Sequence, residues 1–247
     1  MIEVTYVNHM GDDLSVVNAA RVSFGKKSDY MPRVHMGEPK VLQFKDDKLI
    51  KYLAKHNHKS PFNHAFATFH VKAPVFVARQ LVKHEYMPWN EVSRRYVDSY
   101  PQYYVPDVWR GRSEDKKQGS SDKRITKLKQ YHLDSSHLPD DKSYYGDIIE
   151  KHVPINEEVR NVVNKLDSLY HELLDSGVAP EQARMVLPQS MMTEWYWSGT
   201  LYAFAKMCGL RLKEDTQAET RIVAEKIEDV MAELYPVSWE ALRMYEE

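Results

Sequence analysis

The sequence contains a single cysteine, Cys208, among its 247 residues. One cysteine excludes an internal disulfide framework and is typical of a protein from a reducing compartment. No apolar run approaches the roughly 18 residues that a membrane span needs. The N-terminal segment MIEVTYVNHMGDDL has neither the basic part nor the long apolar part of a signal peptide. These absences predict a cytoplasmic protein.

The chain also lacks an excess of charge of either sign. Its 34 lysines and arginines and 36 aspartates and glutamates leave a formal net charge of −2. Such a balance creates no overall field for nucleic acid, so we expect small-molecule partners, with no nucleic acid and no membrane. Hydrophobic residues make up 43% of the sequence, which is enough for a full core. The length favours one large domain over residues 1–247.

The motifs of several familiar enzyme classes are missing as well. The sequence has no GxGxxG, GxxxxGK[ST], HExxH or GxSxG pattern. His56, His58, His64 and His70 have no second cluster of thiolate or carboxylate ligands beside them, so no metal site is predicted. Cys208 lies at the end of the apolar segment FAKMCGLR, where a small buried residue is more common than a thiolate nucleophile. We therefore predict catalysis without cysteine.

What the sequence does contain is a mixture of strand and helix patterns. Alternating apolar residues predict strands over 2–7 and 65–73, and residues 191–197 indicate a short strand or an extended link. Helical spacing with capping residues predicts helices over residues 12–24, 46–56, 74–84, 155–177, 180–187, 198–209 and 214–234. The strands and helices do not alternate regularly enough for a parallel sheet. The predicted fold class is α+β, with a small, mainly antiparallel sheet packed with several long helices.

Residues 110–152 interrupt this pattern. They include RGRSEDKKQGSSDKRITKLKQ, which is polar, charged and poor in apolar periodicity. The cations of this segment could contact phosphate, but a solvated loop is the more common explanation of such a run. We predict a polar surface insertion and assign it no function.

The stretch RQLVKHEYMPWNEVSRRY, residues 79–96, concentrates polar chemistry after an apolar run. Gln80, Asn90 and Glu91 supply the donor and acceptor edges that a pyrimidine ring needs, and Ser93 supplies a hydroxyl. Arg95 can grip an anion through its planar guanidinium. Any one arginine alone is more often part of a surface ion pair. The grouping favours a nucleotide site.

Within this stretch, NEVSRRY resembles the NExSxRY half of the signature of flavin-dependent thymidylate synthases. The resemblance continues through DDLSVVNAARVSF, HKSPFNHAFATFHVKAPVFVARQ, PEQARMVLPQSMMTEWYW and GLRLKEDTQAE. Outside residues 25–44 and 110–152, it covers nearly the whole chain in the same order. This collinearity is stronger evidence than one motif.

The resemblance implies a flavin-dependent thymidylate synthase-like fold and a reductive methylation. Methylenetetrahydrofolate gives a methylene group to C5 of dUMP, and FAD reduced by NADPH gives the hydride, so that dTMP is formed. No enzyme cysteine attacks the pyrimidine in this family, in agreement with the interpretation of Cys208. The family also implies a homotetramer with sites shared between subunits.

The resemblance implies site residues by position. The substrate-binding residues would be Gln80, Glu91, Ser93, Arg95, Arg184 and Arg211. Arg211, beside the pyrimidine carbonyl, Ser93 and His58 would be catalytic. The cofactor-binding residues would be His58, Ser60, Asn63, Lys83, His84, Glu85, Asn90 and Thr200.

The chain departs from the family pattern at several of these positions. Lys83-His84-Glu85 stands where the family usually has Arg-His-Arg, and Pro88 replaces a serine. Glu85 reverses a charge beside an anionic cofactor, so either it points away or another cation compensates. Asn63 and Thr200 stand where a glutamate and an asparagine are expected. Two alternatives stay open: a flavin- and folate-dependent hydroxymethylase acting on dUMP or dCMP, and a nucleotide-binding homologue without catalysis.

Overall fold

The computed structural model describes residues 1–32, 40–97, 99–114, 119–133 and 148–245. Two compact units make up the chain: the first comprises Met1–Val92 and Met192–Glu247, and the second comprises Ser93–Met191. The single domain predicted over residues 1–247 stays a prediction.

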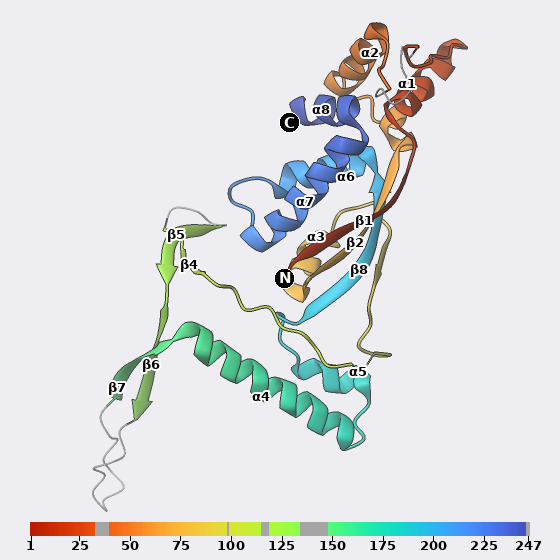
Figure 1. Ribbon diagram of the computed structural model, residues 1–247. Helices are drawn as coiled ribbons and strands as arrows, with labels where there is room; N and C mark the ends of the chain where they lie inside the picture. Colours follow the sequence, from red (N-terminus) through yellow and green to blue (C-terminus); the bar gives the residue numbers. More distant parts are fainter. Residues whose placement is uncertain (33–39, 98, 115–118, 134–147, 246–247) are drawn as a thin grey trace, which may run out of the picture. The chain divides into compact units, whose positions relative to one another are not determined.

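The first unit is built on a four-stranded antiparallel sheet (Figure 1). Its strands are β1 (Glu3–Met10), β2 (Phe66–Pro74), β8 (Met192–Thr200) and β3 (Trp89–Glu91), in the order β1-β2-β8-β3. β8 pairs with β2 along its whole length and with β3 through Trp195–Trp197. This sheet confirms the predicted antiparallel α+β class.

Only one face of this sheet is buried. Phe69 and Val71 of β2 lie opposite Trp197 and Trp195 of β8, and all four side chains are buried. Successive side chains of a strand point to opposite faces, so the residues between them lie on the other face. There His70 Nε2 lies 3.1 Å from a carboxylate oxygen of Glu194, and both side chains are partly exposed.

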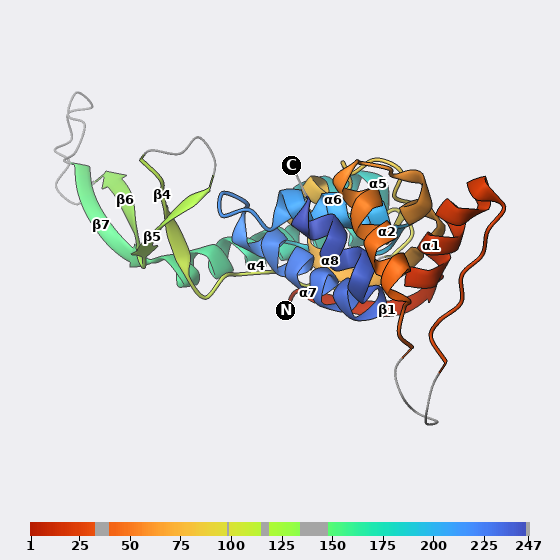
Figure 2. The same ribbon diagram turned by 90° about the horizontal axis from the view of Figure 1, so that it is seen from above.

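Helices cover the buried face. The first unit contains α1 (Asp13–Arg21), α2 (Phe44–Lys55), α3 (Val75–Leu81), α6 (Leu201–Arg211), α7 (Ala218–Leu234) and α8 (Pro236–Met244), with short 3-10 helices η1 (Val22–Phe24) and η2 (Ser60–His64). Figure 2 shows α6, α7 and α8 lying together. An aspartate N-cap was predicted for α1, and Asp12 caps it through a capping box with Ser15. No helix was predicted at α8, whose first amides, on Val237 and Ser238, donate to the buried carboxylate of Asp13.

Two of the boundaries that differ from those predicted lie beside the site. α3 ends at Leu81, whereas the sequence predicted a helix to residue 84. α6 begins at Leu201, whereas a helix was expected from Ser198. Thr200 ends β8 and caps α6, because its hydroxyl accepts a hydrogen bond from the Ala203 amide at 3.1 Å. The strand therefore turns into the helix at Thr200.

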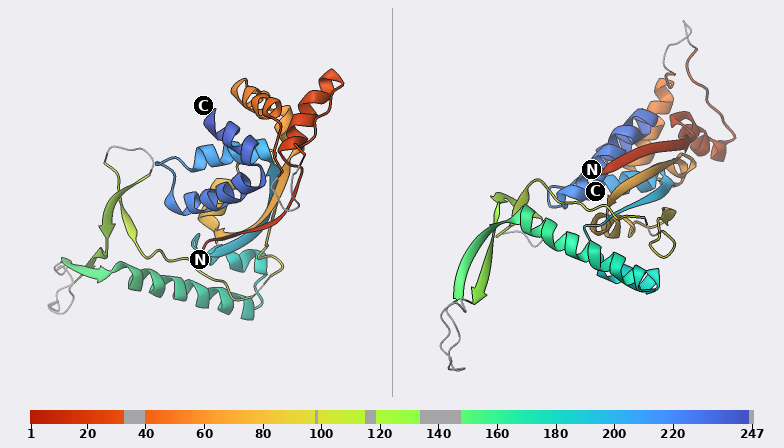
Figure 3. Two further views of the ribbon diagram at one scale, coloured as in Figure 1. Left: turned by 45° about the horizontal axis from the view of Figure 1, so that its top comes forward. Right: turned by 60° about the horizontal axis from the view of Figure 1, so that its bottom comes forward.

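The second unit contains a long helix and two hairpins. Its helices are α4 (Ile155–Asp175), α5 (Pro180–Ala183) and η3 (Arg184–Val186). β4 (Trp109–Arg112) pairs with β5 (Ser120–Ile125), and β6 (Lys127–Leu133) pairs with β7 (Ile148–Pro154). Figure 3 shows β7 running directly into α4. The described parts of residues 110–152 thus form strands where a loop was expected.

Within the described residues, the structure has no helix that combines the length and the apolarity of a membrane span.

Candidate active site

A pocket of about 670 Å³ opens in the first unit. It lies between the start of η2, the link from α3 to β3, and the start of α6. The residues around this main pocket are Lys59, Asn63, Lys83, His84, Glu85, Tyr86, Met87, Thr200, Tyr202, Ala203 and Lys206. Its volume suits a cofactor-sized ligand, and its walls combine apolar and cationic side chains.

The main pocket contains five of the eight residues predicted to bind the cofactor: Asn63, Lys83, His84, Glu85 and Thr200. The other three, His58, Ser60 and Asn90, are exposed and are not among the described lining residues. The ring of His58 lies beside that of Tyr52, with 6.0 Å between centroids. The structure therefore brings together residues from three distant segments, and the role of each stays a prediction.

Local backbone features shape this pocket. Gly199 lies next to Met87, and a Cβ atom at Gly199 would come within 2.9 Å of Met87 Cε. The glycine lets Met87 pack against β8 and line the pocket. Tyr86 has φ +59° and its side chain is 90% exposed. A bulky residue is rarely found in this left-handed region, so the link between α3 and β3 is strained at the pocket.

Arg211 is fixed beside the main pocket. Its Nη2 donates to the backbone carbonyl of Gln80 at 2.8 Å, and its Nε donates to His84 Nε2 at 3.1 Å. Burial and the nearby Arg211 cation lower the pKa of His84 to about 4. Neutral His84 accepts from Arg211 at Nε2, which places its own proton on Nδ1. His84 is thus both a wall of the pocket and a support for the guanidinium.

The other predicted substrate residues of the first unit are held by hydrogen bonds. Gln80 Nε2 donates to Gln217 Oε1 at 2.6 Å. One carboxylate oxygen of Glu91 accepts from the Thr193 hydroxyl at 2.7 Å, and the other accepts from Trp89 Nε1 at 3.2 Å. Because both oxygens of Glu91 have partners, its carboxylate is held in a fixed orientation on β3.

The remaining predicted residues lie in the second unit. Arg95 Nε is 3.7 Å from a carboxylate oxygen of Glu181, and Arg184 Nε donates to the Glu181 carbonyl at 3.3 Å. The Ser93 hydroxyl accepts from the Arg95 amide at 3.3 Å. Both arginine side chains are exposed. The structure thus groups Arg95 and Arg184 around Glu181.

Sequence reasoning missed several lining residues, notably Lys59, Tyr202 and Lys206. Exposed lysines and a tyrosine at a helix start carry no local signal of a site. The one available hint is that Tyr202 and Lys206 are four residues apart and lie on the same face of α6. The Lys59 ammonium lies 5.5 Å from the centroid of the Tyr202 ring. Only the folded chain brings Lys59 to α6.

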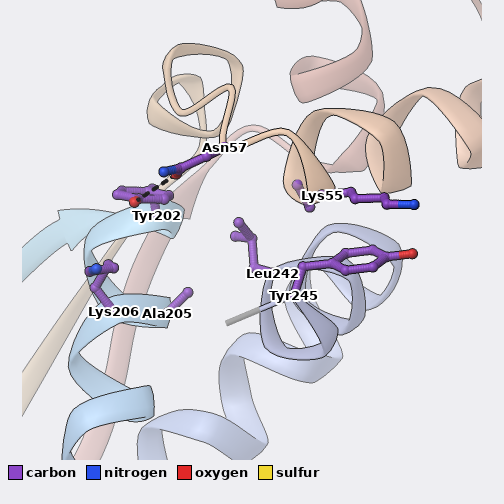
Figure 4. Close-up of a pocket in the computed structure, with 8 residues that line it drawn as sticks. Lys55, Asn57, Tyr202, Ala205, Lys206, Leu242 and Tyr245 are labelled. Carbon is purple, nitrogen blue, oxygen red and sulfur yellow. Dashed lines mark hydrogen bonds between the residues drawn. The ribbon is translucent and has the colours of Figure 1, made fainter. Parts of the chain in front are cut away.

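A second, smaller pocket of about 130 Å³ shares Tyr202 and Lys206 with the main pocket. Figure 4 shows its lining, with the Tyr202 hydroxyl donating to Asn57 Oδ1 at 3.3 Å. Leu242 and Tyr245 form its other side. Tyr202 and Lys206 therefore separate the two cavities.

Cys208 lies away from this chemistry. Its side chain is fully buried in α6, and its thiol donates to the Ala224 carbonyl at 3.7 Å. Burial raises the pKa of this thiol well above its usual value. A neutral, buried thiol is a poor nucleophile, as the sequence analysis predicted. Among the residues that the structure describes, no cluster of three His, Cys, Asp or Glu side chains could hold a metal ion.

Comparison with known proteins gives consistent matches. A family model described as thymidylate synthase complementing protein matches residues 5–237. The flavin-dependent thymidylate synthase of Thermosipho africanus is 35% identical over 235 residues, with 95% of this chain and 88% of the relative covered. The enzyme of that name from Thermus thermophilus is 34% identical over 238 residues, with 96% and 74% covered.

Solved structures show the same relationship. A UMP/dUMP methylase PolB from Streptomyces cacaoi, bound with 5-Br dUMP, matches with a TM-score of 0.73 and 28% identity. The match covers 99% of this chain and 96% of that chain. Together with the observed sheet and helices, these matches confirm the predicted fold class and the predicted family.

Proposed function

Because the chain belongs to the flavin-dependent thymidylate synthase family, whose members are methyltransferases, we propose that it converts dUMP to dTMP by reductive methylation. The cofactor is FAD, with methylenetetrahydrofolate as carbon donor and NADPH as reductant. One observation carries the proposal: His84 lines the main pocket and also accepts a hydrogen bond from Arg211. A cofactor in the pocket and a pyrimidine at Arg211 would therefore be neighbours.

The lining of the main pocket fits a flavin dinucleotide. Lys59, Lys83 and Lys206 suit a diphosphate, while Met87, Tyr202 and Ala203 offer apolar surface to a planar ring. When bound there, FAD supplies the hydride for the reduction. The residues of the chain would orient the cofactor and exclude water from the face beside His84.

Arg211 is the residue best placed to act on the pyrimidine. The His84 ring and the Gln80 carbonyl fix the plane of its guanidinium. Burial lowers the pKa of Arg211, but an arginine remains charged at neutral pH. A fixed cation beside a pyrimidine carbonyl would stabilise negative charge that develops on that oxygen. Gln80, held by Gln217, would orient the base from the same side.

The second unit carries two arginines that would suit the phosphate of a nucleotide. Arg95 and Arg184 both contact Glu181, and two guanidinium groups suit a phosphate monoester. The pair with Glu181 is long and exposed, so a phosphate could displace it at little cost. Ser93, whose hydroxyl accepts from the Arg95 amide, would add a hydrogen bond.

We propose that the enzyme works as a homotetramer in the cytoplasm. Helix α4 supports association, because Val162 and Leu169 are 45% and 40% exposed on a strongly amphipathic helix. A partner that binds only the folded, FAD-loaded form would make assembly and cofactor binding stabilise each other. Light scattering of the protein with and without FAD tests this. A monomer that retains FAD and full activity would contradict it.

The function is tested with purified protein, dUMP, methylenetetrahydrofolate and NADPH, with the product identified by mass. Formation of dTMP by a yellow protein supports the proposal. A hydroxymethylated product, or a product from dCMP, would favour the alternative reaction, and a colourless inert protein would favour a non-catalytic homologue.

UMP forms a second arm of this assay, because one structural relative is described as a UMP/dUMP methylase. Methylation of UMP at a rate similar to that of dUMP would extend the proposed substrate to the ribonucleotide. A strong preference for dUMP would restrict it to deoxyribonucleotides.

A further inference from the structure

The charged residues around the main pocket come from several segments, one of which is the signature segment Lys83-His84-Glu85. Lys83 and Glu85 both line the pocket, so the cation and the anion of that segment cancel. His84, with a pKa of about 4, is neutral at physiological pH. The segment therefore brings no net charge to a pocket that is proposed to hold an anionic cofactor.

Two lysines from other elements restore a positive charge. Lys59 precedes η2, and Lys206 lies on α6. With Lys83, they place three lysine charges against the single charge of Glu85, which leaves the lining at +2. The diphosphate of a dinucleotide carries two negative charges. The net charge of +2 on the lining therefore balances the two negative charges of the diphosphate.

The surroundings of these lysines favour a ligand contact over an internal one. All three side chains are exposed, and the ion pairs found among the described residues include none of them. Lys59 contacts the face of Tyr202, and Lys206 lies one helical turn beyond that tyrosine. Two flexible ammonium groups therefore flank one aromatic ring at the wall of the pocket.

We propose that Lys59 and Lys206 bind the diphosphate of FAD and replace the charge that Glu85 removes from the signature segment. This inference rests on the proposed function, because it takes FAD as the ligand of the main pocket. Lysine suits this role, since a point charge on a flexible stem follows the phosphate without a fixed angle. The binding of FAD should then depend strongly on salt.

The test is the affinity of the full-length apoprotein for FAD, measured by quenching of flavin fluorescence. Lys59→Met and Lys206→Met keep the apolar stem and remove the charge. We expect each to weaken FAD binding about tenfold, the cost of one charged hydrogen bond. The matched control is Lys226→Met, because Lys226 is exposed on α7 and lines neither described pocket. It should bind FAD like the unmodified protein.

Salt and Glu85 provide two further readouts. Between about 0.01 M and about 1 M NaCl the screening length falls about tenfold, so wild-type affinity should fall. The double variant Lys59→Met/Lys206→Met should lose much of this salt dependence. Glu85→Gln should tighten FAD binding, because it removes the opposing charge without altering a lysine.

The outcomes separate this inference from the proposed function. If the wild type binds FAD and both lysine variants match Lys226→Met, the lysine assignment is wrong while the proposed function stands. If the wild type binds dUMP but no FAD, both fail. Weakened binding in both variants, with unchanged circular dichroism and unchanged affinity for dUMP, supports the assignment.

Discussion

Helix α6 carries a charged residue of the proposed site in its middle, Lys206, and another at its C-terminal end, Arg211, and holds them in different ways. At the C-terminal end, Arg211 is half-buried and donates to His84 and to the Gln80 carbonyl. In the middle of the helix, Lys206 is exposed beside Tyr202 in the wall of two pockets. A fixed guanidinium suits a role that depends on direction, and a flexible ammonium suits one that depends on charge alone. We therefore expect changes at Arg211 and at Lys206 to affect different measurements.

Replacing Arg211 should have the largest effect. Arg211→Ala removes the cation that would stabilise charge on the pyrimidine, so we expect turnover to fall about 10²–10³-fold. FAD should remain bound, since Arg211 is not among the described lining residues of the main pocket. Rates of dTMP formation and the visible flavin spectrum measure the two properties.

Arg211→Lys sharpens this test, because it keeps the charge but loses the two directed hydrogen bonds. We expect it to recover little activity. Lys213→Met, an exposed residue just beyond α6, is the control and should behave like the wild type. Near-normal turnover in Arg211→Ala would remove Arg211 from the mechanism.

His84 links the fixed end of α6 to the pocket, and its ionisation should affect stability. Its pKa is about 4 in the folded protein, below the ordinary value of 6.5, because burial and the Arg211 cation disfavour the imidazolium. Between these two pH values the unfolded chain binds a proton that the folded chain does not. The free energy of unfolding should therefore fall as the pH is lowered from about 6.5 to about 4.

His84→Gln should make this fall shallower, because glutamine does not titrate. Urea denaturation of the apoprotein at several pH values measures the slope. His56→Gln, at an exposed histidine after α2, is the control and should keep the wild-type slope. The same slope in His84→Gln as in the wild type would show that His84 is not buried in its neutral form.

A substitution at Thr200 tests the N-terminal end of α6, beside the main pocket. Thr200→Ala removes the cap on the Ala203 amide, which should lower the free energy of unfolding by about 1 kcal/mol. For a chain of this size that corresponds to a melting temperature about 2–4 °C lower in the apoprotein. Thr200→Ser keeps the hydroxyl and should retain most of the stability. Equal melting temperatures for Thr200→Ala and the wild type would contradict a capping role.

The smallest effect is expected at Cys208, which lies between Lys206 and Arg211 on α6. Cys208→Ser should leave turnover unchanged, because the thiol is buried and not a nucleophile. The serine hydroxyl can donate to the Ala224 carbonyl as the thiol does, so the stability should change by at most about 1 kcal/mol. Loss of all activity in a folded Cys208→Ser protein would contradict the cysteine-free mechanism.

Local patterns predicted the elements whose own residues decide their structure. Asp12 and Ser15 cap α1, and the alternation of residues 65–73 gives β2, because capping and alternation act over a few residues. β3 was missed because three residues are too few to show alternation, and only pairing with β8 makes Trp89–Glu91 a strand. In the described parts of 110–152, cross-strand pairing forms hairpins that polar sequence does not signal.

The site was predictable to a similar extent. The signature segment pointed to Lys83, His84 and Glu85, and all three line the main pocket. The hydrogen bond between Arg211 and His84 joins residues 127 positions apart, so it depends on the packing of α6. Lys59 and Lys206 resemble ordinary surface lysines until η2 and α6 come together. The reversed charge of Glu85 was visible in the sequence. The lysines proposed to offset it, Lys59 and Lys206, could not be identified there.

The burial of Cys208 also makes the native protein convenient for site-directed labelling. The chain has no other cysteine, and a neutral thiol with no exposed surface reacts slowly with maleimides and other alkylating reagents. A cysteine introduced at an exposed position such as Lys226 would therefore be the one fast-reacting thiol, with no need to remove the native residue first. A fluorophore or spin label placed there would report on subunit association in the unaltered core.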